Sequence, residues 1–395
     1  MGAIAETPGN SKVTGLPNQR EAILLKAALL QPPSASEAWQ TWIRNVDLEH
    51  DLTPGERRLL PLAYSNLNSG AGVDRLRFHP KIFGFCKRTL YYNSILMRRL
   101  LAVVTMLETI GVQPIVLKGA ALILSGTYRK AATRVMADYD LLVPFDRKGD
   151  VVDFLVSNGF QPLPRWNWYV EPFRQVHSIS LESKDYGELD LHWFPLTAHK
   201  NEKSNALFFA HKQQLTKADQ DIFIPEPELQ LVHAMVHGLQ NDTADRIQWI
   251  CDAVKLIRHH PSINWDQVAQ HAQALHVGAF VQHGTEYLAQ AFGDTMAEDW
   301  LAPIRRIPVS ATENRIFTAL NSPQTRMRDQ LFLRKQDLQQ LQPGRSAVYY
   351  WRQLYRDWSH AASASSNNSL LREFLIAGSH LLRNENYQMG DYRKK

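Results

Sequence analysis

The sequence has few cysteines and little net charge. Only two of its 395 residues are cysteine, Cys86 and Cys251, and each lies in a helical pattern of apolar residues. A disulfide framework or a thiolate metal site needs more cysteines at short spacings, so neither is expected, and a reducing compartment fits the chain. The 44 Lys and Arg exceed the 39 Asp and Glu by only 5. This excess is too small to indicate a nucleic-acid surface, so nucleic acid is not an expected partner.

Long apolar runs are lacking as well. The sequence contains no stretch of about 18 uninterrupted apolar residues, and it does not begin with a basic segment followed by an apolar run. We therefore expect no membrane span and a cytoplasmic location. With 44% hydrophobic residues over 395 positions, the chain can bury a large core in two or three structural units.

Composition and periodicity divide the chain into four regions. Residues 1–17 are rich in Gly, Pro, Ser and Thr without periodicity and are predicted to form a flexible lead-in. Helical spacing dominates 18–112, the N-terminal helical region, and is clearest at 81–110. The period shortens in 113–225, and helical spacing returns in 226–395. The predicted fold class is α+β, with a small mixed-sheet core between two helical regions.

Four short runs in the central region are predicted strands. They are 115–117, 138–143, 176–182 and 187–193, the last two joined by a short turn as an antiparallel hairpin. Pro144 ends the second strand, and Asp146 is predicted to cap the helix that follows.

Two carboxylates occupy alternate positions of the second predicted strand. Side chains two apart on a strand point to the same face, so Asp138 and Asp140 are expected side by side. Adjacent carboxylates repel each other, and the usual reason to tolerate that repulsion is a divalent cation such as Mg²⁺, which prefers oxygen ligands. An exposed polar strand face is the alternative interpretation of this triplet.

The predicted hairpin offers a third acid. In the run GELDLHW, the side chains of Glu188, Asp190 and His192 share one face of the strand, and the apolar side chains share the other. The polar face of an ordinary two-faced sheet would produce the same alternation. The hairpin alone therefore does not decide between the two interpretations.

A lysine and a glycine follow the first predicted strand. Lys118 can neutralise phosphate charge, and Gly119 allows a phosphate to approach the backbone. Arg129, Lys130 and Arg134 lie between this turn and the carboxylates and are candidate phosphate contacts. We favour Arg134, although an exposed basic loop is the commoner explanation of such residues.

The C-terminal helical region contains three further polar residues whose roles the sequence leaves open, as it does that of His192. His233 and His237 are four residues apart on a predicted helix, but HAMVH lacks the Glu of a zinc hydrolase motif, so satisfied or surface histidines are favoured over zinc ligands. His237 could still face a nucleotide. Asp252 lies inside the apolar helix WICDAVKLI and is expected to need a buried partner.

Three segments together resemble a known family. The run IVLKGAALILSGTYRKAATRVMADYDLLV, followed by ELDLHW and RIQWICDAVKLI, is similar to the uncharacterised bacterial nucleotidyltransferase family of the DNA polymerase beta-like superfamily. The resemblance covers residues 80–260. The chain departs from the superfamily pattern in having Lys-Gly-Ala rather than Gly-Ser at the turn, and in a longer interval from Gly119 to Asp138.

The resemblance implies a function. It implies transfer of a nucleoside monophosphate from a nucleoside triphosphate, ATP in the first instance, to a small-molecule or peptide acceptor in a biosynthetic pathway, with release of pyrophosphate. By position it implies Asp138, Asp140 and Asp190 as catalytic ligands of Mg²⁺, with Mn²⁺ as a substitute. The nucleotide would contact Lys118 and Gly119, with Arg134 as our added candidate.

Two other functional classes stay open. A noncatalytic nucleotide-sensing or interaction protein could retain the same fold, because fold does not fix function. A template-independent RNA polymerase would need a basic groove beside the carboxylates, and the flanking helices show no basic stripe.

Overall fold

The structure is a computed structural model, and it describes most of the chain. The described residues are 15–68, 80–163, 177–217, 219–240, 247–293, 298–322 and 327–363. The chain divides into two compact units, Met1–Pro323 and Gln324–Lys395. Nearly all of the predicted lead-in lies outside the described residues. Within the part of the chain that the structure describes, no helix is long and apolar enough to cross a membrane.

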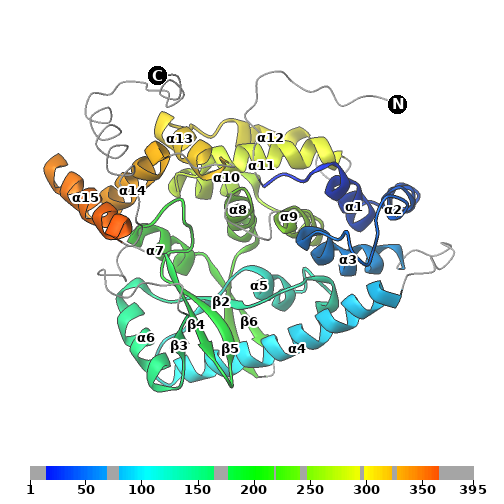
Figure 1. Ribbon diagram of the computed structural model, residues 1–395, viewed down its shortest axis with the longest axis horizontal. Helices are drawn as coiled ribbons and strands as arrows, with labels where there is room; N and C mark the ends of the chain where they lie inside the picture. Colours follow the sequence, from blue (N-terminus) through cyan, green and yellow to red (C-terminus); the bar gives the residue numbers. More distant parts are fainter. Residues whose placement is uncertain are drawn as a thin grey trace. The chain divides into compact units, whose positions relative to one another are not determined.

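One mixed sheet organises the first unit (Figure 1). Across the described residues it has seven strands in the order β3-β4-β5-β2-β1-β7-β6. The strands are β1 (Ile115–Val116), β2 (Tyr139–Leu142), β3 (Gln161–Pro162), β4 (Ser178–Ser183), β5 (Gly187–His192), β6 (Lys212–Lys217) and β7 (Gln220–Pro225). Strands β4 and β5 form the predicted antiparallel hairpin, whereas β2 and β5 run parallel. A small mixed sheet among helices confirms the predicted fold class.

Strand β2 lies at the centre of the sheet and is buried along its whole length. Burial on both faces is typical of a strand that helices cover. Here helices α4 (Pro80–Glu108) and α5 (Lys118–Leu124) both contact β2. The polar Asp140 is therefore buried, which is unfavourable unless partners compensate its charge.

Four helices precede the sheet. They are α1 (Gln19–Leu29), α2 (Ser34–Ile43), α3 (Pro54–Leu67) and α4 (Pro80–Glu108), and α1 and α3 both begin with a capping box. Helix α4 confirms the helix predicted at 81–110. Leu90 of this helix is 50% exposed, while Leu96, Leu100 and Val103 are buried. Apolar residues are frequent enough on this helix that their spacing fits more than one face.

Glu56 joins the first three helices. Its carboxylate accepts hydrogen bonds from Arg20 Nε at 2.6 Å, from Trp42 Nε1 at 2.9 Å and from the Thr53 backbone N–H at 2.9 Å. Burial alone would raise the pKa of Glu56, but the hydrogen bonds from Arg20, Thr53 and Trp42 hold that pKa below its ordinary value. The buried charge is therefore fully compensated.

The remaining helices of the first unit follow or interrupt the sheet strands. They are α5 (Lys118–Leu124), α6 (Lys148–Ser157), α7 (Glu202–Ala210), α8 (Pro227–Gly238), α9 (Gln248–His259), α10 (Trp265–Ala274), α11 (Gly278–Ala291), α12 (Glu298–Arg305) and α13 (Ala311–Leu320). The prediction that Asp146 caps α6 is wrong. A short 3-10 turn over Phe145–Arg147 precedes α6 and places Arg147, which makes no side-chain cap, at the capping position.

Helices α8 and α9 pack very closely where α8 ends. A Cβ atom on Gly238 would lie 2.1 Å from Trp249 Cγ, so only glycine permits this approach. Helix α5 contacts both α8 and α9. Because α5 begins just after β1 ends, the α8–α9 pair lies near the end of β1.

The second unit contains α14 (Met327–Leu341) and α15 (Ala347–Ser363) within the described residues. Leu331, Leu338, Tyr350 and Leu354 form its buried cluster. The helical character predicted for 226–395 extends into this unit. The predicted division of the chain at 112 and 225 stays a prediction.

Candidate functional site

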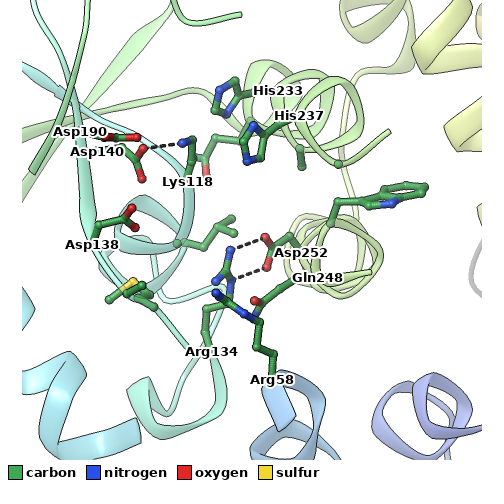
Figure 2. Close-up of a pocket in the computed structure, with 18 of the residues that line it drawn as sticks. Arg58, Lys118, Arg134, Asp138, Asp140, Asp190, His233, His237, Gln248 and Asp252 are labelled. Atoms are coloured by element: carbon green, nitrogen blue, oxygen red, sulfur yellow. Dashed lines mark hydrogen bonds and ion pairs between the residues drawn. The ribbon is translucent and has the colours of Figure 1, made fainter. Parts of the chain in front are cut away.

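A cavity of about 490 Å³ is lined by residues of β2, β5, α5, α8 and α9 (Figure 2). This volume is in the range typical of small-molecule sites. All six residues assigned to the site from sequence line it: Lys118, Gly119, Arg134, Asp138, Asp140 and Asp190. The structure thus brings together residues that are up to 72 positions apart in the chain.

The sheet register places the carboxylates next to one another. Asp140 on β2 is directly paired with Asp190 on the parallel strand β5. Asp138 comes one residue before β2, two positions from Asp140, and faces the same cavity (Figure 2). Ser180 on β4 donates a hydrogen bond to Asp190 Oδ1 at 2.5 Å, which fixes the orientation of that carboxylate.

Lys118 lies against the central carboxylate. It has a φ of 52°, a left-handed conformation that costs a non-glycine residue about 1–3 kcal/mol. Its ammonium donates to Asp140 Oδ1 at 2.5 Å, and His192 Nε2 lies 3.0 Å from the same oxygen. Lys118 therefore has a strained backbone at the β1–α5 junction, and its side chain forms an ion pair inside the cavity.

The two members of this pair both remain charged. Burial would raise the pKa of Asp140, but Lys118 and His192 hold it far below its ordinary value. Burial would lower the pKa of Lys118, but Asp140, Asp190 and Asp138 raise it above its ordinary value. An ammonium and a carboxylate therefore face each other at neutral pH.

Asp138 shows that the site carries excess negative charge. Burial, together with the nearby carboxylates of Asp140, Asp190 and Glu188, raises its pKa to about 7, and Lys118 offsets this only in part. The ligand atoms of Asp140, Asp190 and His192 all lie within 4.8 Å of one another, close enough for one cation to bind them. Two of these ligand atoms are carboxylate oxygens, which suit a hard divalent cation, and the third is an imidazole nitrogen. Asp138 is not part of this group.

A second ion pair forms another wall of the cavity. Arg134 donates from Nε and Nη2 to the two oxygens of Asp252, each at 2.9 Å, and Tyr128 donates its hydroxyl to Asp252 Oδ1 at 2.7 Å. Arg134 also donates to the Val135 carbonyl. The buried partner expected for Asp252 is therefore Arg134, and this guanidinium is held by the protein itself.

Gly119 lies against this second pair. A Cβ atom added there would be 2.9 Å from Met136 Sδ and 3.2 Å from Arg134 Cζ. The close packing of these two side chains explains the glycine without reference to a phosphate. The predicted contact between Gly119 and a nucleotide stays a prediction.

Two histidines of α8, His233, which is buried, and His237, which is partly buried, face the carboxylates across the cavity (Figure 2). The rings of His233 and His237 are stacked with centroids 6.1 Å apart, and His233 Nε2 lies 3.0 Å from the Pro195 carbonyl oxygen. Burial, reinforced by the Lys118 ammonium, lowers the pKa of His233 to about 3 and that of His237 well below its ordinary value. Both rings are neutral hydrogen-bonding groups at physiological pH.

Sequence reasoning missed several residues of the cavity wall. They include Arg58 of α3, Gln230 of α8, and Gln248 and Trp249 of α9. The α9 residues belong to the run RIQWICDAVKLI, whose resemblance to a family was a usable signal. Arg58 carried no signal, because it precedes the sheet by more than 50 residues. Arg129 and Lys130, the less favoured phosphate contacts, are exposed.

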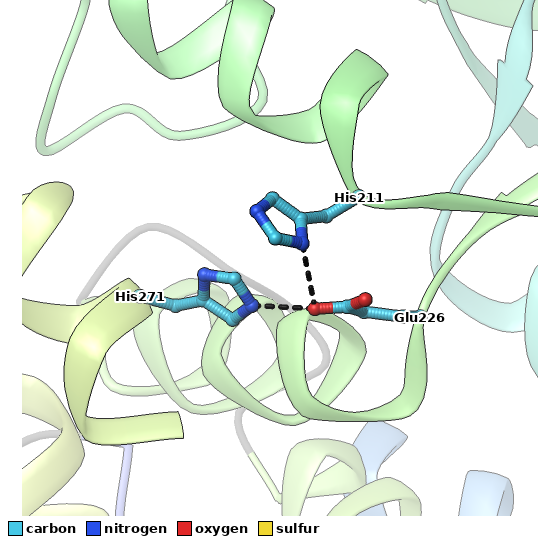
Figure 3. A group of neighbouring side chains, drawn as sticks. All are labelled: His211, Glu226 and His271. Carbon is cyan, nitrogen blue, oxygen red and sulfur yellow. Dashed lines mark hydrogen bonds and ion pairs between the residues drawn. The ribbon is translucent and has the colours of Figure 1, made fainter. Parts of the chain in front are cut away.

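A second group of possible metal ligands joins three elements outside this cavity (Figure 3). Glu226 Oε1 lies 3.1 Å from His211 Nδ1 and 2.6 Å from His271 Nε2. The same oxygen accepts a hydrogen bond from Gln267 Nε2 at 2.5 Å. Three nitrogens already surround one oxygen, so hydrogen bonding alone accounts for the group. It fixes the start of α8 to the end of α7 and to α10.

Comparison with known protein families shows which family the chain belongs to. The sequence model of a family described as uncharacterised nucleotidyltransferase matches residues 55–293. The chain belongs to this family. The region that matches this nucleotidyltransferase family includes both ion pairs and all three carboxylates of the cavity.

Solved structures and curated proteins add little to this assignment. An antigenic nucleotidyltransferase-like protein from Paracoccidioides brasiliensis is 14% identical with a TM-score of 0.34, over 55% of this chain and 95% of that chain. Likeness at that level supports no statement about substrates. No curated protein gives a significant match.

Proposed function

We propose that this nucleotidyltransferase-family protein is a metal-dependent enzyme. It transfers a nucleoside monophosphate from a nucleoside triphosphate, ATP in the first instance, to an acceptor hydroxyl, and it releases pyrophosphate. The acceptor is a small molecule or a peptide, and we expect the reaction to occur in the cytoplasm. The observation that carries the proposal is the group of three adjacent carboxylates with a single close ammonium in one cavity.

The carboxylates are suited to hold Mg²⁺ or Mn²⁺. Asp138, Asp140 and Asp190 would supply oxygen ligands. Burial first, and then the neighbouring carboxylates, raise the pKa of Asp138, and a divalent cation would compensate the charge of those carboxylates. When bound, the metal would activate the attacking oxygen and stabilise charge on the phosphates. We assign the ligand role to these three residues, as the family resemblance implies.

Lys118 binds the triphosphate in this proposal. Its ammonium pairs with Asp140 in the structure, but a bound cation would compensate that carboxylate instead. Lys118 can then neutralise the β and γ phosphates, where the negative charge of the leaving pyrophosphate increases. The left-handed backbone at Lys118 directs this side chain toward the carboxylates rather than along α5.

The reaction needs one bond to form and one to break. The acceptor oxygen attacks the α phosphorus, the bond from that phosphorus to the pyrophosphate oxygen breaks, and the hydroxyl proton leaves to water. Neutral His233 and His237 line the same cavity and can donate hydrogen bonds to the nucleotide without adding charge. Arg134 stays a predicted phosphate contact, which requires Asp252 to share its guanidinium.

One observation favours a second candidate function. The Lys118 ammonium occupies Asp140 Oδ1 directly, so it competes with any cation for that oxygen. A protein that keeps this pair when nucleotide binds would be a noncatalytic nucleotide sensor or interaction protein. The two candidates differ in whether pyrophosphate is released.

The test combines binding with product analysis. Each of the four nucleoside triphosphates is added with Mg²⁺ or Mn²⁺, thermal stability is measured, and the products of reactions with candidate acceptors are identified by mass. An enzyme gives a metal-dependent shift and an acceptor that has gained one nucleoside monophosphate. A shift with no pyrophosphate from any acceptor supports the sensor, and a ladder of nucleotide additions supports a polymerase.

A further inference from the structure

A second cavity of about 580 Å³ adjoins the carboxylate site. Four residues line both cavities: Arg58, Met136, Ala137 and Glu188. Ala137 immediately precedes Asp138, and Glu188 lies two positions before Asp190 on β5. The wall common to the two cavities therefore includes residues one and two positions away from two of the carboxylates. A molecule in the second cavity would lie beside the proposed reaction centre.

Helices α3 and α4 supply most of the second cavity, and part of its lining is apolar. Phe85, Ile95 and Leu96 come from α4, and Val135 comes from the segment before β2. Tyr92 adds an aromatic ring that is 49% exposed. Such a lining accommodates a flat apolar body, because aromatic and aliphatic side chains gain by covering apolar surface.

The charge of this cavity is opposite to that of the carboxylate site. Arg57, Arg58, Arg88 and Arg99 line it, and Glu188 is the one carboxylate among the described lining residues. The whole chain has a net charge of only +5, so this concentration of arginine is local. Arginine binds carboxylates and phosphates through paired N–H groups.

Two of these arginines are held in defined positions. Arg99 donates from Nε to the Asp185 carbonyl at 3.0 Å, in the turn between β4 and β5. The guanidinium of Arg88 lies 5.3 Å from the centre of the Tyr92 ring. The cavity thus presents cationic groups beside an aromatic ring.

We propose that this second cavity is the acceptor subsite and that the acceptor is an organic oxyanion. It would carry a flat apolar body, a carboxylate or phosphate that the arginines bind, and a hydroxyl that reaches the carboxylate site. The hydroxyl oxygen forms the new bond to the α phosphorus, pyrophosphate leaves with its bridging oxygen, and the proton passes to water. The oxyanion itself is unchanged. The acceptor role rests on the proposed function, whereas the binding of an oxyanion does not.

Binding is tested first, with the full chain and without metal or nucleotide. The probes are 4-hydroxybenzoate, its neutral counterpart 4-hydroxybenzamide, and phenyl phosphate, with dissociation constants measured by ligand-observed NMR. We expect at least one anionic probe to bind at least tenfold more tightly than the amide. The tighter of the two anionic probes shows whether carboxylate or phosphate is preferred. Equal binding of all three, or no binding of any, overturns the proposal.

Matched arginine variants locate the binding. Arg57→Ala and Arg88→Ala should each raise the dissociation constant of the preferred anionic probe at least fivefold and leave the thermal stability of the protein unchanged. Arg98→Ala is the control, because Arg98 is an exposed residue of α4 that is not among the described lining residues. An effect of Arg98→Ala equal to that of Arg88→Ala, or no effect of any variant, overturns the location.

Turnover separates this inference from the proposed function. With an accepted anionic acceptor, Arg57→Ala should raise the acceptor KM at least fivefold and leave the ATP KM within twofold. Arginine-dependent probe binding without pyrophosphate release from any acceptor would mean that the proposed function fails and only the oxyanion site stands. Pyrophosphate release that is insensitive to Arg57 and Arg88 would mean that the acceptor binds elsewhere.

Discussion

Two ion pairs line the same cavity, but their surroundings differ. Arg134 and Asp252 form a closed pair, in which two guanidinium nitrogens and the Tyr128 hydroxyl satisfy the carboxylate. Lys118 and Asp140 form an open pair, because two more carboxylates, those of Asp138 and Asp190, lie beside it. The closed pair has no charge left over. The open pair has an excess of negative charge, which is the condition for binding a cation.

The comparison shows that the balance of charge in a buried group indicates whether the group has a structural or a functional role. A buried pair that satisfies itself contributes to a unique packing, and breaking it leaves one charge uncompensated. A buried group whose charges do not balance is unfavourable until a ligand completes it. The predictions below test whether the two pairs of this protein divide in that way.

The largest expected effect is on turnover at the open pair. Asp138→Asn, Asp140→Asn and Asp190→Asn should each lower metal-dependent pyrophosphate release by about a thousandfold, or about 4 kcal/mol, because each removes a carboxylate that we propose as a metal ligand. Glu182→Gln is the control, since Glu182 is an exposed residue of β4 and is not among the described residues that line either cavity. Full activity in the three Asn variants would remove the catalytic assignment, and an inactive Glu188→Gln with an active Asp190→Asn would change the third ligand.

The same carboxylate variants should leave the protein folded. At 100 times its dissociation constant, a ligand stabilises the native state by about 2.7 kcal/mol. Wild type should therefore gain thermal stability with Mg²⁺ and ATP, and the Asn variants should lose most of that gain. Without ligand, Asp138→Asn should be at least as stable as wild type, because it removes repulsion between carboxylates.

At the closed pair the main effect should be on stability. Asp252→Asn leaves Arg134 without its carboxylate and should lower the free energy of unfolding by about 3 kcal/mol, measured by urea denaturation. Replacing both residues, as Arg134→Met with Asp252→Leu, should restore most of that loss. Nucleotide binding by the stable double variant then tests Arg134. Retained affinity would contradict its predicted phosphate contact, with Arg129→Met as the exposed control.

A smaller effect is expected from the cation of the open pair. Lys118→Met should weaken ATP binding about tenfold, or about 1.4 kcal/mol, and AMP binding much less, because we propose that the ammonium binds the outer phosphates. Isothermal titration of both nucleotides in the presence of Mg²⁺ measures the difference. Equal losses for ATP and AMP would show that Lys118 acts on the fold or on the metal ligands instead.

The smallest effect concerns a third pair, Arg20–Glu56, in which the carboxylate is buried but the Arg20 side chain is 28% exposed. Glu56→Gln should cost about 1 kcal/mol at pH 7, less than Asp252→Asn, because solvent can compensate the Arg20 charge that Glu56 no longer compensates in the variant. Since the folded pKa of Glu56 is below its unfolded value, its contribution is present above the unfolded pKa and is lost as pH falls through the folded pKa. The difference in stability between wild type and variant should therefore shrink below about pH 4. A difference that is independent of pH would contradict the assignment.

The three carboxylates of the candidate site could be predicted from the alternation of polar and apolar residues in the sequence. The alternation in DYD and in ELDLH identified the face that carries Asp138, Asp140 and Asp190. The alternation did not give the register, because the pairing of Asp140 with Asp190 depends on contacts between strands 50 residues apart. The same alternation is compatible with a solvent-exposed face, so only burial of the strand distinguished the two interpretations.

Other features could not be predicted for physical reasons. Strand β6 has the sequence KQQLTK and lies at an edge of the sheet, where exposed polar residues hide the strand pattern. The sequence placed Arg134 near the site but not its partner, since Asp252 is 118 residues away. The side chains that fill the space beside Gly119 also become neighbours only after folding.

The packing around Gly119 has an evolutionary consequence. Its missing side chain, Met136 and the Arg134–Asp252 pair occupy one volume, although they come from three separate segments of the chain. A larger residue at 119 displaces Met136 or the guanidinium, and loss of the guanidinium leaves Asp252 uncompensated. Relatives that replace Gly119 should therefore also change 134, 136 or 252, and these four positions should covary as a group rather than drift one at a time.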